Sequence, residues 1–238
     1  MIDLKEYLQG NEYPGRGILF GKTQNGLPVF AYFIMGRSEN SRNRVFVQEG
    51  KDLRTKAYDE SKVEDPSLII YYPVRVTEDG RQIVTNGDQT DTIYHAIAGG
   101  KCFNRALKTR TFEPDGPNYT PRISGMMQPG EQLNYVMNII KSADGDPEST
   151  IRHLYRYENV KAGVGHFLHT YQGNGNPLPS FKGEPRTVAL PQDAQALATL
   201  LWENLNAENK ISLFVRQLNA DGSTTDILYN AREDENHG

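Results

Sequence analysis

The chain has 238 residues and a formal net charge of -4, so a substantial buried core is possible, and we expect one domain over residues 1–238. The acidic balance argues against a general nucleic-acid or anionic-membrane surface and requires any basic patch to be local. The single cysteine excludes an internal disulfide, and without an apolar run of signal-peptide or membrane-spanning length we expect a cytoplasmic protein.

The first part of the chain is predicted to be rich in strands. Apolar spacing in residues 1–12 predicts a short amphipathic helix that ends before Pro14. Residues 17–21 and 28–35 are aromatic and β-branched runs separated by an Asn-Gly turn signal, which predicts a hairpin. We expect residues 45–47 to continue the same sheet.

A charged connection, residues 50–66, precedes a second predicted hairpin. Residues 68–76, LIIYYPVRV, are the most strand-like run of the chain, and a Glu-Asp-Gly turn leads to a partner strand at residues 82–85.

The middle of the chain changes from strand to helix periodicity. Apolar residues three and four apart predict a helix over residues 90–98, which Asp88 or Thr90 can cap and which a Gly-Gly pair ends. The segment FNRALKT is compatible with a continuation of this helix, and residues 113–125 are predicted to form a loop.

Strands and one long helix are predicted for the rest of the chain. Apolar positions in PQDAQALATLLWENLN lie on one face of a helix of about four turns. Five strands are predicted before and after it, at residues 133–141, 150–157, 165–171, 211–217 and 225–229. The tail, residues 231–238, is expected to fray. Runs of strands with interposed helices predict an α+β sandwich, with the helices packed outside the sheets.

The sequence has no familiar metal, phosphate-loop or nucleophile motif. No His-x-x-x-His, Cys-x-x-Cys or EF-hand spacing occurs, and neither a P-loop nor a Gly-x-Ser-x-Gly elbow is present. His166 and His169 lie three apart in a predicted strand and so on opposite faces, which disfavours a shared metal. Because residue 2 is Ile, removing the initiator Met would not expose a nucleophile. We expect no metal and no cofactor.

Three arginines lie in one short connection, GRSENSRNR, between two apolar runs. A solvated turn does not require a planar guanidinium, so Arg37, Arg42 and Arg44 together favour an oxygen-rich or multiply charged partner. A single arginine is more often part of a surface ion pair, and this alternative stays open for each of them alone.

Further polar stretches lie at the ends of predicted elements: YPGRG, IIYYPVR, TNGDQTDTI and FEPDGPNYTPRI. Arginines and a helix start can bind a phosphate, and Glu or Tyr can carry a proton, so the set suits a nucleotide. The alternatives are structural, with Asn86 in a turn, Asp88 as a helix cap, and Glu113 and Thr120 in an irregular loop.

The ordered series YPGRG, FAYFIMGRSENSRNR, IIYYPVR, TNGDQTDTI, NYTPRI and HTYQGNGNPLPSFKGEPR resembles the archaeal-type IMP cyclohydrolase family, which also occurs in some bacteria. TNGDQTDTI, followed by a Glu and then Asn-x-TPRI, is the most specific part. The resemblance implies a four-layer αββα sandwich similar to the N-terminal-nucleophile hydrolases. It also implies ring closure of 5-formamidoimidazole-4-carboxamide ribotide (FAICAR) to IMP with loss of water, the final step of de novo purine biosynthesis.

The resemblance also implies a set of site residues. It gives catalytic roles to Arg37, Tyr71 and Glu113, with Tyr71 rather than Tyr72 matching the family's tyrosine. It implies substrate contacts from Arg16, Arg42, Arg44, Asn86, Asp88, Thr90, Asn118, Thr120 and Arg122. The chain departs from the family pattern in a longer loop around Arg42 and in Tyr119, which is inserted before TPR.

The chemistry of this reaction suits these residue types. The carboxamide nitrogen attacks a formyl carbon of the same molecule, so holding both groups in one plane supplies much of the acceleration without a metal or cofactor. A donor must stabilise the formyl oxyanion, and a base must take the amide proton. The alternative is a nucleotide-binding sensor domain without turnover, whereas Ile2 disfavours an amide hydrolase. The expected partners are a small-molecule nucleotide and further copies of the chain in a homo-oligomer, with neither nucleic acid nor membrane.

Overall fold

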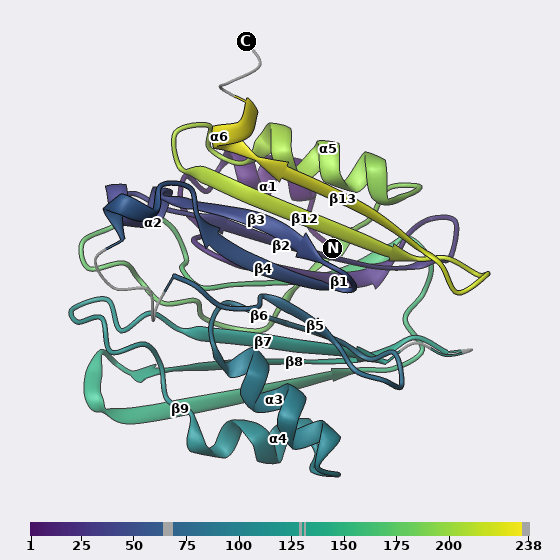
Figure 1. Ribbon diagram of the computed structural model, residues 1–238, viewed down its shortest axis with the longest axis horizontal. Helices are drawn as coiled ribbons and strands as arrows, with labels where there is room; N and C mark the ends of the chain where they lie inside the picture. Colours follow the sequence, from purple (N-terminus) through teal and green to yellow (C-terminus); the bar gives the residue numbers. More distant parts are fainter. Residues whose placement is uncertain (64–68, 129, 131, 235–238) are drawn as a thin grey trace.

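Two antiparallel β-sheets lie face to face, and helices cover their outer faces (Figure 1). The computed structural model describes residues 1–63, 69–128, 130 and 132–234. One sheet has six strands in the order β11-β10-β1-β2-β12-β13, and the other has seven in the order β3-β4-β5-β6-β7-β8-β9. The layers are therefore helix, sheet, sheet and helix, which confirms the predicted α+β sandwich.

The elements have the following bounds. The six-stranded sheet consists of β1 (Gly17–Lys22), β2 (Pro28–Met35), β10 (Val164–His169), β11 (Arg186–Ala189), β12 (Lys210–Leu218) and β13 (Thr224–Asn230). The seven-stranded sheet consists of β3 (Arg44–Glu49), β4 (Asp52–Ala57), β5 (Val74–Val76), β6 (Gln82–Thr85), β7 (Arg122–Gln128), β8 (Asn134–Ala143) and β9 (Asp146–Tyr157). The helices are α1 (Leu4–Gln9), α2 (Glu39–Arg42), α3 (Gln89–Ala98), α4 (Phe103–Ala106), α5 (Ala194–Asn204) and α6 (Ala231–Asp234), with single 3₁₀ turns at Glu60–Lys62 and Leu107–Thr109. Within the described residues, no helix combines the length and apolar character needed to cross a membrane.

Alternation along the strands distributes the apolar side chains over three core layers. On β2, Phe30 and Tyr32 face the second sheet, whereas Phe33 faces the layer formed by α1 and α5. A third cluster fills the space between the seven-stranded sheet and helices α3 and α4. The two sheets meet closely at Gly125, where an added Cβ atom would lie 2.1 Å from the ring of Phe20. Only glycine permits this approach.

The prediction that residues 45–47 continue the first hairpin's sheet is wrong. They belong to β3, which pairs with β4 in the seven-stranded sheet, because α2 carries the chain from one sheet to the other. The connection 50–66 is more ordered than its charge suggests, since it contains β4. Leu53 and Thr55 alternate inward among charged neighbours. Residues 64–66 lie outside the described residues.

The strand predicted at residues 68–76 is much shorter in the structure, where only β5 is formed. Pro73 has no N–H for the ladder. Before it, the Thr55 hydroxyl donates to the carbonyl of Ile69 at 2.7 Å and accepts from the amide of Tyr71 at 2.8 Å. These side-chain bonds lie beside one backbone bond, from the Thr55 amide to the Tyr71 carbonyl at 2.9 Å. Residue 68 lies outside the described residues. Conversely, β7 begins inside the predicted loop 113–125.

The helix predicted over residues 90–98 is confirmed to within one residue as α3, but the predicted capping of its start is not. Asp88 precedes the helix, but its carboxylate makes no capping hydrogen bond, because it binds the Arg122 guanidinium at 2.9 Å instead. Thr90 lies inside the helix, where its hydroxyl donates to the carbonyl of Gly87. The proposal that either residue caps α3 is therefore wrong. The Gly-Gly pair ends α3 as predicted, and α4 is a separate helix.

At the C-terminus α6 forms, and residues 235–238 of the tail predicted to fray lie outside the described residues.

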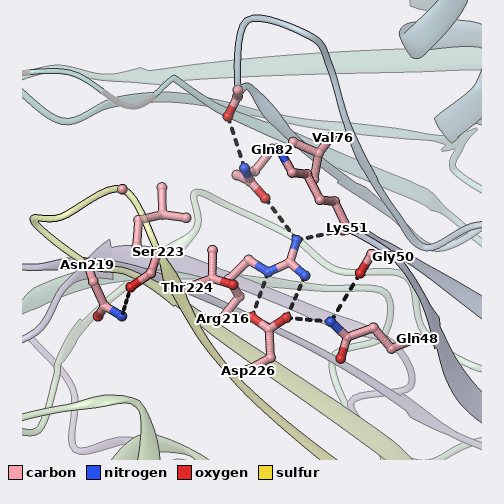
Figure 2. Close-up of a pocket in the computed structure, with 13 residues that line it drawn as sticks. Gln48, Gly50, Lys51, Val76, Gln82, Arg216, Asn219, Ser223, Thr224 and Asp226 are labelled. Atoms are coloured by element: carbon pink, nitrogen blue, oxygen red, sulfur yellow. Dashed lines mark hydrogen bonds and ion pairs between the residues drawn. The ribbon is translucent and has the colours of Figure 1, made fainter.

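A buried arginine connects the two sheets beside a cavity of about 460 Å³ (Figure 2). Arg216 on β12 donates from Nε and Nη2 to the two carboxylate oxygens of Asp226, at 2.7 Å each. Its Nη1 donates to the Lys51 carbonyl in the turn between β3 and β4 at 2.7 Å, and to Gln82 Oε1 on β6 at 3.3 Å. None of the residues implied as site residues by the family resemblance lines this cavity. We interpret the Arg216–Asp226 pair and its contacts as a structural element that holds the two sheets together, called the structural lock below.

Removing the carboxylate of this lock should strongly destabilise the fold. In Asp226→Ala the buried guanidinium loses its counter-ion, so we expect the free energy of unfolding to fall by about 3–5 kcal/mol in equilibrium urea denaturation. Glu39→Gln is the matched control because it removes an exposed pair with Lys62 at 3.5 Å, and it should cost less than about 1 kcal/mol. Equal losses of unfolding free energy in both variants would contradict the stabilising role of the Arg216–Asp226 pair.

Candidate active site

A buried ion pair lies where the start of β1 meets the loop before β7. Arg16 Nη2 donates to both carboxylate oxygens of Glu113, at 2.8 Å each. The side chains are only 12% and 5% exposed, so the pair is almost completely removed from water. Burying two charges is costly unless each neutralises the other, and the pair therefore holds the two segments together.

Two tyrosine hydroxyls meet next to this pair. Tyr71, from the irregular stretch before β5, lies 2.8 Å from Tyr32 of β2, measured between the two hydroxyl oxygens. Burial raises the pKa of Tyr71, while the guanidinium groups of Arg44 and Arg16 oppose the shift. Tyr71 is therefore a protonated phenol at neutral pH and can act as a hydrogen-bond donor.

Arg44, at the start of β3, points into the same region. It is 4% exposed, and its Nε donates to the carbonyl of Ser41 at 2.8 Å. Among the described residues, no hydrogen-bond partner is found for its two terminal nitrogens. Burial lowers its pKa, with the nearby charge of Arg16 contributing, while Tyr71 opposes the shift. A buried guanidinium with free N–H groups is suited to carbonyl or phosphate oxygens.

Burial and two neighbouring arginines have opposite effects on the pKa of Glu113. Burial raises its pKa, and Arg16 and Arg122 oppose the shift. Arg122 Nη1 in turn donates to Asp88 at 2.9 Å and to the Gln89 side-chain oxygen at 2.8 Å. A carboxylate whose pKa lies above its ordinary range is a better proton acceptor near neutral pH.

One wall of the region is formed by Thr120 and three residues without a predicted role. The Thr120 hydroxyl is hydrogen-bonded to Tyr171 and to the Asp115 carboxylate. Burial raises the pKa of Tyr171 to about 12, and its ring stacks on Tyr13 with 6.0 Å between centroids. Sequence reasoning missed these three residues and Tyr32. The only available signal was that they lie within the polar stretches YPGRG, FEPDGPNYTPRI and HTYQGNG or in the strand before the arginine-rich connection.

The three arginines of the connection 36–44 have different environments. Arg44 is the one that enters the buried region. Arg37 is exposed at its rim, where Nη1 donates to Asn174 at 2.6 Å and the guanidinium lies 5.1 Å from the centroid of Tyr13. Arg42 binds the Gly36 carbonyl at 3.1 Å through Nε, and the structure does not bring it to Glu113.

The polar residues around α3 mainly organise the loops. Asn86 Nδ2 donates to the Pro121 carbonyl at 2.9 Å, and its Oδ1 accepts from the Ile123 amide at 2.8 Å, which joins the start of α3 to β7. Thr90 bonds within its own turn, and Asn118 accepts from the amide of Leu178 at 3.0 Å. Asp88 pairs with both Arg110 and Arg122. The Asp88 carboxylate is therefore already paired with two guanidinium groups.

The structure thus brings a subset of the predicted residues together. The buried group, called the ionic cluster below, contains Arg16, Tyr32, Arg44, Tyr71 and Glu113. Arg122 and Thr120 border it. The arrangement combines a phenol donor, a guanidinium with free donors and a carboxylate acceptor in a water-poor environment, which can stabilise an oxyanion and accept a proton.

The Arg16–Glu113 pair should show strong coupling in a double-mutant cycle. Glu113→Gln leaves a buried guanidinium uncompensated, and Arg16→Met leaves a buried carboxylate, so each should cost about 3–5 kcal/mol of unfolding free energy. The double variant should cost much less than the sum because no charge remains buried alone. Additive losses by urea denaturation would show that the pair is not energetically linked.

Comparisons with known proteins identify the family of the chain. The family model described as IMP cyclohydrolase-like protein matches residues 13–223. A curated protein from Methanopyrus kandleri, named IMP cyclohydrolase, is 33% identical over 115 residues, which are 47% of this chain and 57% of the relative. The matched part thus spans a little over half of that relative's length. Since the family model covers most of the sequence, the chain belongs to the IMP cyclohydrolase-like protein family.

Proposed function

We propose that this chain is an IMP cyclohydrolase that closes FAICAR to IMP with loss of water. The observation that carries the proposal is Arg44, whose terminal nitrogens have no partner among the described residues although the side chain is buried beside Tyr71. Free buried donors beside a phenol suit the carbonyl oxygens of the two reacting arms. The family match and the name of the curated relative support the same activity.

In this proposal, Glu113 and Tyr71 of the ionic cluster each accept one proton and donate one proton during the reaction. The carboxamide nitrogen bonds to the formyl carbon and loses a proton to Glu113, while the formyl oxygen takes a proton from Tyr71 under stabilisation by Arg44. Both oxygens of Glu113 accept from Arg16, and each retains a further lone pair. The new hydroxyl then leaves as water with the proton from Glu113. The formamido nitrogen returns a proton to Tyr71 as the C=N bond forms.

The remaining residues bind and enclose the ribotide in this proposal. Arg37 at the rim contacts the phosphate or ribose, which extend away from the reacting arms. Thr120 and Arg122 form the wall beside Glu113. Four residues in and before α3 and in the loop before β7 shape this wall through their bonds to the backbone and to arginines: Asn86, Asp88, Thr90 and Asn118. Arg42 has no substrate contact in this proposal, because its guanidinium donates to the Gly36 carbonyl and to the Asn209 side-chain oxygen.

We further propose that residues 1–238 form one domain of the type found in N-terminal-nucleophile hydrolases. The four layers and the continuous core between the sheets support this. Because the reaction is intramolecular and both proton transfers are assigned to side chains, the mechanism involves no cofactor. The homo-oligomeric state and the cytoplasmic location remain predictions.

Two arginines of one connection provide a direct test. Purified protein supplied with FAICAR should form IMP, and Arg44→Gln should lower kcat/KM by about 100-fold or more because it removes buried donors to the oxyanion. Arg42→Gln is the matched control and should stay within about threefold, since its guanidinium contacts Gly36 and Asn209. Tight IMP binding by a wild-type protein that forms no IMP would instead favour the sensor domain.

The pH dependence should report Glu113. The carboxylate form is the proton acceptor, and burial raises the pKa of Glu113, so kcat/KM should fall with decreasing pH at values above the ordinary glutamate pKa of about 4.3. The rate is full above the raised pKa and is lost below it. Glu113→Gln should be slow and lack this acidic limb. An unchanged limb in that variant would assign the base elsewhere.

A further inference from the structure

Tyr32 is a fully buried polar side chain without a role in the mechanism above. It is 0% exposed on β2, and its ring stacks on Phe46 with 5.6 Å between centroids, so its position is fixed by the core. Among the described residues, the only hydrogen-bond partner of its hydroxyl is Tyr71, at 2.8 Å. A phenylalanine would fill the same space, so packing does not explain the hydroxyl.

The direction of this hydrogen bond decides what Tyr71 can do. A phenol has one proton to donate, so one of the two tyrosines donates and the other accepts. If Tyr71 donated to Tyr32, its proton would be directed away from the substrate. Tyr32 has no other acceptor among the described residues, and a buried hydroxyl without an acceptor is costly. Tyr32 is therefore the donor whenever Tyr71 donates to a bound substrate.

We propose that Tyr32 is a positioning residue, whose hydroxyl donates to the Tyr71 oxygen and thereby directs the Tyr71 proton toward the formyl oxygen. The bond also stabilises the negative charge that develops on Tyr71 as its proton moves to the substrate. This inference rests on the proposed function, in which Tyr71 supplies that proton. It adds a residue that acts through Tyr71, its hydrogen-bond partner.

The surroundings of Tyr32 support a donor that keeps its own proton. Burial raises the pKa of Tyr32 well above its ordinary value, and Tyr71 adds to the shift, while Arg16 opposes it. The hydrogen bond from Tyr32 acts in the opposite sense on Tyr71, whose pKa it lowers against the dominant effect of burial. The proton on Tyr71 is therefore the one that can be transferred.

The test combines Tyr32→Phe with a double-mutant cycle. We expect kcat for IMP formation to fall about tenfold or more, with KM changed less than about twofold, because the lost bond acts on a developing charge. In a Tyr71→Phe background the same substitution should have no further effect on kcat. Tyr135→Phe is the matched control, since it removes a buried phenol that is bonded to His166 elsewhere between the sheets, and it should keep the wild-type kcat.

A second variant keeps the test informative if Tyr32→Phe folds poorly. Replacing Tyr32 with 3-fluorotyrosine retains the hydroxyl and most of the packing, and the fluorine makes this hydroxyl a stronger hydrogen-bond donor. We therefore expect kcat to rise or to stay at the wild-type value. An unchanged kcat in Tyr32→Phe, or an equal fall in the Tyr71→Phe background, would overturn the proposal. Absence of IMP formation by the wild-type protein would contradict the proposed function itself.

Discussion

The bidentate contact between Arg16 and Glu113 is the interaction on which the candidate site depends. Both side chains are almost fully buried, and neither charge would be tolerated there without the other. The contact joins residues 97 positions apart and fixes the start of β1 against the loop before β7. It also sets the local field, because the Arg16 charge acts on Tyr71, Tyr32 and Arg44.

The packing of the two sheets holds these charged groups in fixed positions. The middle of the space between the sheets is apolar and tightly packed, with Gly125 allowing the closest approach. Buried polar groups lie outside this apolar core, in the ionic cluster and in the separate Arg216–Asp226 ion pair. A reaction that depends on holding two arms of one molecule in a plane benefits from such a frame, because small displacements of the donors would weaken them.

Three neighbouring arginines acquire three different roles from their backbone positions. Arg44 opens β3 and is directed inward, Arg37 follows β2 and stays at the rim, and Arg42 lies in α2 and binds the backbone. The short helix rotates the chain between the two sheets, so residues close in sequence are separated in space. Residue type alone therefore predicts an anion-binding segment but does not indicate which arginine enters the buried region.

Much of the fold follows from local sequence. The hairpin of β1 and β2, the amphipathic α5 and the strands β8, β9, β12 and β13 are predicted from periodicity and turn residues, which act over a few residues. The motif order also indicates the family. Tertiary structure alone decided that β3 joins the second sheet, that β4 lies within a charged connection, and that Asp88 pairs with Arg122 rather than capping α3. It also decided that Tyr32 meets Tyr71, because that contact depends on how β2 packs against the irregular stretch before β5, and the two residues are 39 positions apart.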